Sequence, residues 1–524
     1  MSEGNNMGCR YTVRRLSPSV LVTAGLVSIL GIMGCSVGPD FVRPDPLPVK
    51  HYTQGAETTA TIFTDGQAQC FEEGAAVAAD WWRLFNSSKL DDLIKEVLAN
   101  NQTLKAAQAR LRQSQNNLQA GYGIFYPQLD AGFDASRLKS SQVRVSGNPG
   151  SSIFNLYTLT GTVGYALDVF GGNRRTVENL QAQVDFQRYT VLGSYLALSG
   201  NVVNTVIAAV AYRSQIEATE QIISVQKEQI RIAEAQVEAG TVPYVNVVSI
   251  KSQMAATEAT IPPLKQKLGQ AEHLLASLVG RAPAEWAPPQ IDLAELKLPG
   301  DLPITLPSEL VRQRPDILAA EAQLHSASAE IGVATAALFP SFNLNGTYGL
   351  NSTSMSDLLN SSSSFWSLGA NVAAPIFHGG TLLSQRQAAI EGYQAFLADY
   401  RQTVLGAFTQ VADTLQALEY DAEGLRSQSQ ALDAAEEALR LIEANYQSGV
   451  ANYLQVLVAN SQYHQAKIGY LQTRAQRFQD TVALFIALGG GWWNADENIL
   501  GSSGTGEGLK LWPLNGTGRS EQRK

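Results

Sequence analysis

Four short stretches of the chain alternate apolar and polar residues with a period of two. In the first of them, Leu129 and Phe133 alternate with Asp130 and Asp134. This pattern is typical of β-strands whose two faces meet different surroundings. The predicted strands lie at about 128–138, 154–170, 341–351 and 364–377. Their polar positions are Asp130, Asp134, Thr160, Asp168, Asn343 and Asn371.

Each strand pair is followed by a long stretch rich in Ala, Gln, Glu and Leu. The two stretches, at about 174–237 and 382–446, predict helices of roughly 64 residues, or about 95 Å at the usual rise per residue. Apolar residues recur every seven positions near the end of both, which indicates helices that supercoil against neighbours. These positions are Ile216, Ile223, Ile230, Val237, Leu425, Leu432, Leu439 and Tyr446. Gly240 and Gly449 then end the helices, so we expect a hairpin tip at each glycine and a returning helix beyond it.

The order of these landmarks occurs twice, which indicates an internal repeat. The proline before the first strand recurs 213 residues later, as Pro127 and Pro340, and the tip glycines are 209 residues apart. We divide the chain into a signal peptide (1–34), an extended N-terminal segment (35–80), a first repeat (81–300), a second repeat (301–490) and a flexible tail (491–524). The strands and the hairpin tip of each repeat have the positions given above.

Four two-faced strands leave open the question of what covers the apolar face. A soluble sheet would bury it, and a membrane barrel would turn it toward lipid and keep the polar face in water. Four strands cannot close a barrel, and open strand edges in lipid leave backbone groups unpaired. The lipid-facing alternative therefore requires several copies of the chain. Two copies supply eight strands and three supply twelve, and the pattern does not choose between them.

The N-terminal segment has the features of an export signal. Arg10, Arg14 and Arg15 precede the apolar run VLVTAGLVSILGIM, which is short for a membrane-spanning helix. The run ends at Cys35, and the sequence resembles the lipobox of bacterial lipoproteins, in which the cysteine is lipidated and the chain is cut just before it. Ser36 stands where inner-membrane lipoproteins usually carry Asp, so the resemblance implies an outer-membrane destination.

Charge and motifs exclude several classes of function. The chain carries a net charge of −9, and because residues 1–34 contribute +2, the remainder carries about −11. This acidity disfavours a nucleic-acid partner. The sequence has no GxSxG, Walker or HExxH motif, and its five histidines are scattered, so we expect neither an enzyme nor a bound metal or cofactor other than the lipid on Cys35. The aromatic run WWRLF at 81–85 lies outside the strands and is interpreted as core packing.

Several motifs make the chain resemble the TolC-like outer-membrane factors, and within them the lipoprotein branch of NodT type. They are CSVGPDFVRP (35–44), DWWRLFNSSKLDDLIKEVLANN (80–101), RQRPDILAAEAQL (312–324) and the paired tips GTVPYVNV and GVANYLQV. The resemblance implies an α+β membrane protein, a homotrimer with a twelve-strand outer-membrane β-barrel, four strands per chain, continued by a long periplasmic α-helical coiled-coil barrel. It also implies an equatorial belt drawn from the N-terminal segment, from IPPLKQ to the stretch 282–306, and from the C-terminal tail.

The resemblance further implies a passive exit duct for small molecules, with a periplasmic adaptor and an inner-membrane pump as partners. The predicted lumen residues are Asp130, Asp134, Asp168, Asn343 and Asn371, and the predicted adaptor contacts are Gly240, Val242, Gly449 and Ala451. At the periplasmic tip, Tyr446 matches a family tyrosine. Asn246, Gln455 and Val458 stand where relatives carry gating acids, and Ala451 stands in place of an arginine. We therefore expect an uncharged constriction built from Asn246, Gln455 and Val458, with packing of the tip as the alternative role for these residues.

Two rival functions remain open on the sequence. One is a periplasmic coiled-coil scaffold lipoprotein whose strands form a small soluble sheet, and the other is a secreted enzyme. The exported substrate, whether a drug, a metal, an oligosaccharide or a protein, cannot be inferred from these residues.

Overall fold

The computed structural model describes residues 36–46, 48–49, 51–53, 59–75, 77–139 and 153–494. The chain divides into two compact units. Unit 1 contains residues 1–42, 114–184 and 323–397, and unit 2 contains residues 43–113, 185–322 and 398–524. The predicted signal peptide, Cys35, the loop 140–152 and the tail beyond residue 494 lie outside the described residues.

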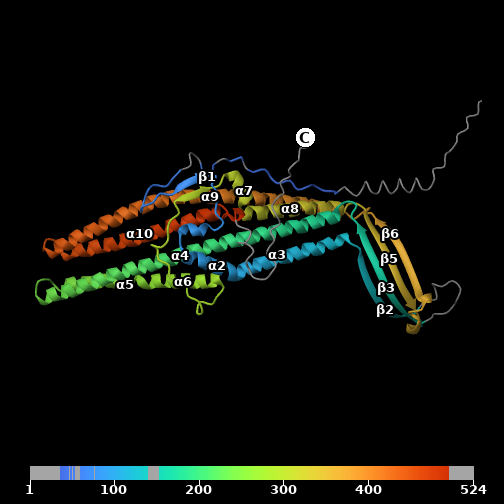
Figure 1. Ribbon diagram of the computed structural model, residues 1–524, viewed down its shortest axis with the longest axis horizontal. Helices are drawn as coiled ribbons and strands as arrows, with labels where there is room; N and C mark the ends of the chain where they lie inside the picture. The colour runs from blue at the N-terminus through green and yellow to red at the C-terminus, as the bar shows by residue number, and fades with distance from the viewer. Residues whose placement is uncertain are drawn as a thin grey trace, which may run out of the picture. The chain divides into compact units, whose positions relative to one another are not determined.

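Unit 1 contains a four-stranded antiparallel sheet (Figure 1). Its strands are β2 (Gln128–Lys139), β3 (Ile153–Leu167), β5 (Ser341–Ser352) and β6 (Ser364–Ala373), in the order β2-β3-β5-β6. The second and fourth predicted strands extend too far, because Asp168 and the segment 374–377 lie beyond the strand ends. In both places the alternating pattern continues past the last ladder hydrogen bond, and Pro375 cannot donate one.

The first described residues of unit 1 form a strap that is tied to the first turn of a long helix. The backbone N–H of Val37 donates to the carbonyl of Phe170 at 3.0 Å. The buried guanidinium of Arg175 donates to a carboxylate oxygen of Asp40 and to one of Glu178, each at 2.7 Å. A Cβ on Gly38 would lie 2.5 Å from Gly332 Cα, so only glycine permits this close approach.

The helices account for most of the remaining chain (Figure 1). They are α2 (Ser88–Asn100), α3 (Gln102–Gly121), α4 (Gly172–Glu238), α5 (Val245–Glu258), α6 (Ile261–Val279), α7 (Pro307–Gln313), α8 (Pro315–Ala336), α9 (Thr381–Gln447) and α10 (Tyr453–Ala487). Five 3₁₀ turns, η1 (Trp81–Phe85), η2 (Tyr122–Phe125), η3 (Met355–Asp357), η4 (Ser361–Ser363) and η5 (Trp492–Asn494), complete the described elements.

The two longest helices are equal in length, and they are separated in the sequence by the same number of residues as the two tip glycines. Both α4 and α9 contain 67 residues, about 100 Å of helix, and α9 begins and ends 209 residues after α4. β2 and β5 each contain 12 residues and are 213 residues apart. The returning helices end in the same register, since Gly280 and Gly489, both with positive φ, are also 209 residues apart.

The strand prediction is incomplete in unit 2. A second sheet pairs β1 (Cys70–Glu73) in parallel with β4 (Asp301–Ile304), which the sequence analysis did not predict. Each strand has only four residues and no clear alternation, so the period-two signal is too short to detect. These strands lie in the N-terminal and Pro-rich segments assigned to the belt. The segment IPPLKQ, which was also assigned to the belt, is helical and forms the start of α6 (Ile261–Val279).

The aromatic run at 81–85 packs in the core of unit 2, as predicted. Trp81 and Phe85 are fully buried in η1, and the ring of Trp81 stacks on Phe485 of α10 with centroids 5.3 Å apart. The helix α4 contains a window that is long and apolar enough to cross a bilayer. That window is 72% buried inside the protein, which accounts for its apolar composition by helix packing.

Candidate functional site

The strand register places four of the five predicted lumen residues, Asp130, Asp134, Asn343 and Asn371, on one face of the sheet. Partners directly opposite each other in neighbouring strands share a face. Asp130 pairs with Thr162, Thr162 pairs with Thr347, and Thr347 pairs with Ser367, which gives a polar row across all four strands.

Further rows continue this face toward both strand ends. Asn343 pairs with Asn371, and Asp134 pairs with Thr158. Among the described strand residues of this face, Asp130 and Asp134 are the only ionisable side chains. Toward the loops 140–152 and 353–363 the same face becomes apolar, with Leu138, Phe154, Leu156 and Phe365. A negatively charged, water-compatible surface therefore covers only part of the face.

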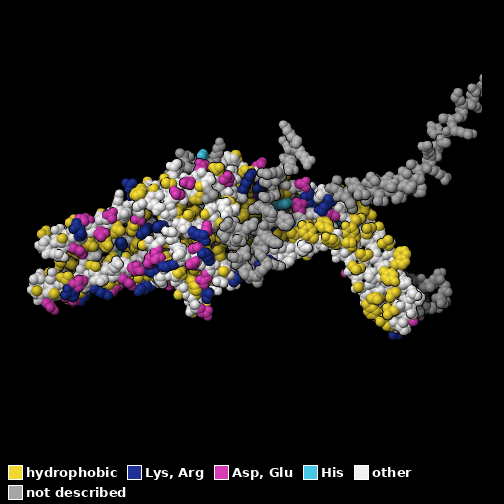
Figure 2. All heavy atoms as spheres, in the orientation of Figure 1, with side chains coloured by type: hydrophobic (Ala, Val, Ile, Leu, Met, Phe, Trp, Pro, Cys, Tyr) yellow, Lys and Arg dark blue, Asp and Glu magenta, His cyan; other side chains and the backbone are white. Residues whose placement is uncertain are grey.

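The opposite face is apolar and exposed. Leu129 and Leu368 are both 80% exposed, at the two edge strands. Other exposed apolar residues of this face are Phe133, Leu159, Val163, Leu344, Tyr348, Trp366 and Val372. Figure 2 shows hydrophobic side chains gathered over the sheet. Because soluble monomers rarely expose a continuous apolar area of this kind, the face requires an apolar environment.

Asp168 does not belong to the polar face. It lies after the last residue of β3, and its carboxylate accepts hydrogen bonds from the backbone N–H groups of Asn173 and Arg174, each at 3.0 Å, and from Arg174 Nε at 3.1 Å. These contacts satisfy donors of the first turn of α4 that have no helical partner. Asp168 therefore fixes the corner between β3 and α4, and its place in the lumen stays a prediction.

The tips of the two helical hairpins lie in unit 2 and share one turn geometry. Gly240 and Gly449 have φ of 70° and 79°, the left-handed conformation that favours glycine. The backbone N–H of Thr241 donates to the carbonyl of Gln236, and that of Val450 donates to the carbonyl of Asn445. Nothing lies within 4 Å of a Cβ placed on either glycine, so both turns border open space.

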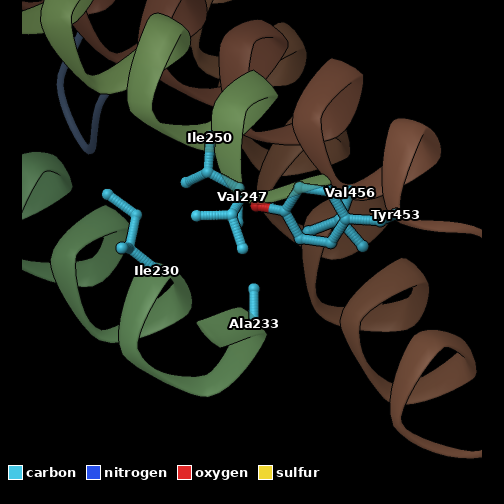
Figure 3. Packing of buried hydrophobic residues seen from close by; sticks show 6 residues of the cluster. All are labelled: Ile230, Ala233, Val247, Ile250, Tyr453 and Val456. Carbon is cyan, nitrogen blue, oxygen red and sulfur yellow. The ribbon is translucent and has the colours of Figure 1, made fainter. Parts of the chain in front are cut away.

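A hydrophobic cluster joins the two hairpins near these turns (Figure 3). Its buried members come from three helices and are Ile230, Ala233, Val247, Ile250, Tyr453 and Val456. Residues packed against them are Val237, Met254, Ile442, Tyr446 and Leu457. The first hairpin, α4 and α5, and the second hairpin, α9 and α10, therefore form one packed unit at their tips.

Polar contacts reinforce this join. The Tyr446 hydroxyl donates to Gln236 Oε1 at 3.0 Å, and the Tyr453 hydroxyl donates to Gln229 Oε1 at 3.4 Å. Gln229 Nε2 in turn donates to Glu443 Oε1 at 3.3 Å. Burial raises the pKa of the Tyr453 hydroxyl and that of the Glu443 carboxyl. The hydroxyl therefore stays protonated and donates throughout the physiological range.

The predicted gate residues occupy different environments. Tyr446 packs in the cluster and ties the hairpins together. The Gln455 side chain accepts from the backbone N–H of Asn452 while Asn452 Oδ1 accepts from that of Gln455, each at 3.0 Å, which is a capping box at the start of α10. Val458 is exposed and Asn246 is partly buried. Of the predicted adaptor contacts, the two glycines are exposed, whereas Val242 and Ala451 are partly buried.

The sequence analysis missed a set of exposed apolar residues at the tips. They are Tyr244, Val245, Val248, Val450 and Leu454. Leu454 and Val458 are four residues apart and therefore lie on one face of α10. Their apolar character at positions that the chain leaves uncovered could have marked them as contact residues.

These features together define a class of protein. A sheet with an exposed apolar face, a polar face and two unpaired edges, carried by a chain that also builds long helical hairpins, is the subunit of an outer-membrane channel. Comparison with known proteins agrees with this class. The family model described as "Outer membrane efflux protein" matches residues 93–281 and 306–490. The chain belongs to the outer membrane efflux protein family.

Relatives and solved structures extend the likeness to nearly the whole chain. The pyoverdine export outer membrane protein OpmQ of Pseudomonas aeruginosa is 31% identical over 422 residues, which are 79% of this chain and 87% of OpmQ. The cation efflux system protein CusC of Escherichia coli is 27% identical over 88% of this chain and 97% of CusC. The structure of the outer-membrane channel OprN matches with a TM-score of 0.78 at 27% identity, over 87% of this chain and 100% of that one. The protein is thus an outer-membrane efflux channel component with a periplasmic extension.

Proposed function

We propose that three copies of the chain assemble into a twelve-strand barrel that conducts small molecules out of the cell. The observation that carries this proposal is the strand register, because it gives the four-stranded sheet an exposed apolar face, a polar face and two unpaired edges at β2 and β6. In lipid, each unpaired edge needs a partner strand, and β2 of one copy beside β6 of the next supplies it. The apolar face then meets lipid, and Asp130, Asp134, Asn343 and Asn371 line the water-filled lumen.

We further propose that the helical hairpins of the three copies continue the duct through the periplasm. Their tips receive a periplasmic adaptor and, through it, an inner-membrane pump that supplies energy and selection. The exposed glycine turns and the exposed apolar residues around Leu454 support a contact surface at this end. The protein itself contributes a passive path and no catalysis.

The anchor of the proposed assembly is a lipid on Cys35. The strap that follows it supports this assignment, since Arg175 holds Asp40 and the N–H of Val37 is bonded to Phe170. Mass spectrometry of the outer-membrane form should show an acylated Cys35 as the first residue, and Cys35→Ser should abolish acylation. An N-terminus at any other residue would reject the anchor without affecting the barrel.

The trimer is tested on the full-length protein extracted from outer membranes in mild detergent. Light scattering coupled to size exclusion should give three times the 56.4 kDa chain mass, less the signal peptide, after correction for detergent. Planar bilayers should show discrete conductance steps. A monodisperse monomer that stays in solution without detergent, once residues before Ser36 are removed, would disprove the assembly.

The tip closure is tested by removing uncharged side chains. We propose that Gln455, Val458 and Asn246 narrow the duct where three copies meet. The double variant Gln455→Ala, Val458→Ala should raise single-channel conductance, whereas Val225→Ala, an exposed valine on α4 away from the tip, should not. Equal conductance of the double variant and the wild type would assign these residues to packing alone.

A further inference from the structure

A cavity of about 270 Å³ lies in unit 2, between the segments 65–67 and 296–298 and the helices α9 and α10. Its polar lining consists of Asp65, Gln67, Lys297, Arg474 and Arg477. This volume is at the lower limit of small-molecule pockets, so it suits a compact ligand better than a drug-sized one. The lining carries three cationic side chains and one carboxylate.

Arg477 is the most deeply buried of these cations. Only 2% of the residue is exposed. Its Nε donates to Gln69 Oε1 at 3.1 Å and its Nη2 donates to Thr61 Oγ1 at 3.2 Å, and both acceptors are neutral. Within the described part of the chain, Nη1 has no acceptor and the guanidinium has no carboxylate within ion-pair distance. A buried guanidinium without a carboxylate in contact lowers the stability of the folded protein unless an anion compensates its charge.

The cavity's single carboxylate is already used. Asp65 stands at the tip of a tight turn, with φ of 50°, and its Oδ1 accepts from the Tyr470 hydroxyl at 2.8 Å. Its Oδ2 lies 3.4 Å from Arg474 Nε. Lys297 has no ion-pair partner among the residues that the structure describes. Asp65 therefore makes its ion pair with Arg474 and attracts Arg477 only from a longer distance.

Two further carboxylates lie near Arg477 but outside the cavity lining. Asp421 of α9 is close to Asp480 of α10, and burial together with Asp480 raises the pKa of Asp421 to about 8. Asp421 therefore holds a proton at neutral pH, and the pair supplies one negative charge rather than two. Against the three cations, Asp65 and this pair supply two negative charges, so an excess of one positive charge remains at neutral pH.

We propose that this cavity binds a compact oxyanion of phosphate size, held by Arg477, Lys297 and Arg474. Charge-assisted hydrogen bonds from Arg477 Nη1 and from the Lys297 ammonium would satisfy the donors that the chain leaves free. Residue 268, which is 209 positions before Arg477, is Leu. The matching position of the first hairpin therefore offers no second guanidinium of this kind. The proposal is independent of the barrel and of the lipid anchor.

The test uses the full-length protein in detergent, with inorganic phosphate as the probe. Thermal unfolding is followed at rising phosphate concentration and at constant ionic strength maintained with chloride. The wild-type Tm should rise with a saturable dependence on phosphate. Lys297→Gln should weaken the apparent phosphate affinity about tenfold, because it removes one charge-assisted contact. Lys227→Gln removes an exposed lysine on α4, which has no ion-pair partner in the described part of the chain, and should leave the affinity unchanged.

Arg477→Gln should abolish the rise of Tm with phosphate. If Arg477→Gln fails to fold, the comparison of Lys297→Gln with the wild type still tests the site. Calorimetric titration with phosphate should give one site per chain. A Tm that does not respond to phosphate, or responds equally to chloride, would overturn the proposal. An equal affinity in the wild type, Lys297→Gln and Lys227→Gln would also overturn it, since the anion would then bind elsewhere.

Discussion

The two helical hairpins have the same dimensions but different interiors. Tyr244 and Tyr453 occupy the same position of the repeat, yet Tyr244 is 63% exposed and Tyr453 only 6%. Phe485 of the second hairpin corresponds to Ala276 of the first. Repeat spacing thus fixes helix length and turn geometry, whereas the side chains at matching positions decide which hairpin provides the core.

The returning helices differ in the same way. The second hairpin returns in one helix, α10, of 35 residues. The first returns in two, because α5 ends at Glu258 and α6 begins at Ile261 with two prolines in its first turn. Proline has no N–H to donate and clashes with the preceding turn, so Pro262 and Pro263 account for the break. No proline occurs at the matching positions, Leu471 and Gln472.

The largest effect should come from the base of the second hairpin. Phe485→Ala removes a fully buried ring stacked on Trp81 and should lower the free energy of unfolding by about 3–5 kcal/mol. The reciprocal change Ala276→Phe overfills a tight site and should cost about 1–3 kcal/mol. Denaturant titration of the detergent-solubilised protein measures both. A loss below about 1 kcal/mol for Phe485→Ala would show that the hairpins contribute equally to the core.

The tyrosine pair tests the tips. Tyr453→Ala empties part of the cluster between the hairpins and removes one of the two donors to Gln229 Oε1, the other being Asn460 Nδ2, so we expect a loss of about 3 kcal/mol. Tyr244→Ala removes an exposed ring and should change stability by less than about 0.5 kcal/mol. Limited proteolysis at the turns should be faster in Tyr453→Ala than in Tyr244→Ala. Equal protease sensitivity of the two variants would contradict the difference in burial.

A pH-dependent effect should distinguish the charged interior of the second hairpin. The pKa of Asp421 is raised to about 8 in the folded protein by burial and by Asp480, against 3.8 when unfolded. The folded state therefore holds a proton that the unfolded state releases, and stability falls as pH rises from about 4 to about 8. Asp421→Asn removes this dependence.

The Tm gain of Asp421→Asn should be absent near pH 4, intermediate at pH 6 and greatest above pH 8. Tyr212 occupies the matching position of the first hairpin, so Tyr212→Phe is the control and should show no such trend. A Tm gain that is constant across this pH range would mean that Asp421 does not hold the proton.

The smallest effect should come from the break in the first returning helix. The double variant Pro262→Ala, Pro263→Ala should lower stability by about 0.4–1 kcal/mol per proline at most, because the two prolines restrict the unfolded chain at positions compatible with a helix start. Circular dichroism should show helicity that is unchanged or slightly higher. A large loss of stability would mean that the break itself is required for packing.

The sequence predicted those parts of the fold that have a long, regular signal. Strands of 10 to 15 residues and heptads over several turns repeat their period often enough to be recognised. Glycine at 240 and 449 marks the turns because a left-handed residue is needed there. The four-residue strands of the β1–β4 sheet carry no such signal. Asp168 was placed in the lumen because alternation alone does not show where a strand ends.

The candidate site could be predicted less completely. Asp130, Asp134, Asn343 and Asn371 follow from alternation and lie on the polar face of the sheet. The closure proposed for Asn246, Gln455 and Val458 depends on how neighbouring copies would meet at the tip, which the pattern of one chain does not contain. The burial of Arg477 depends on Thr61 and Gln69, more than 400 residues away in the sequence, so no local window could reveal it.

The equal length of α4 and α9 limits how such a duct can change its reach. One residue inserted into α4 alone would advance everything beyond it by about 1.5 Å and turn it by about 100° relative to α9. The tyrosine hydroxyls would then miss their glutamine acceptors on the sister hairpin. A longer or shorter version of this protein therefore needs matched insertions or deletions in both halves of the gene, in multiples that restore whole helical turns.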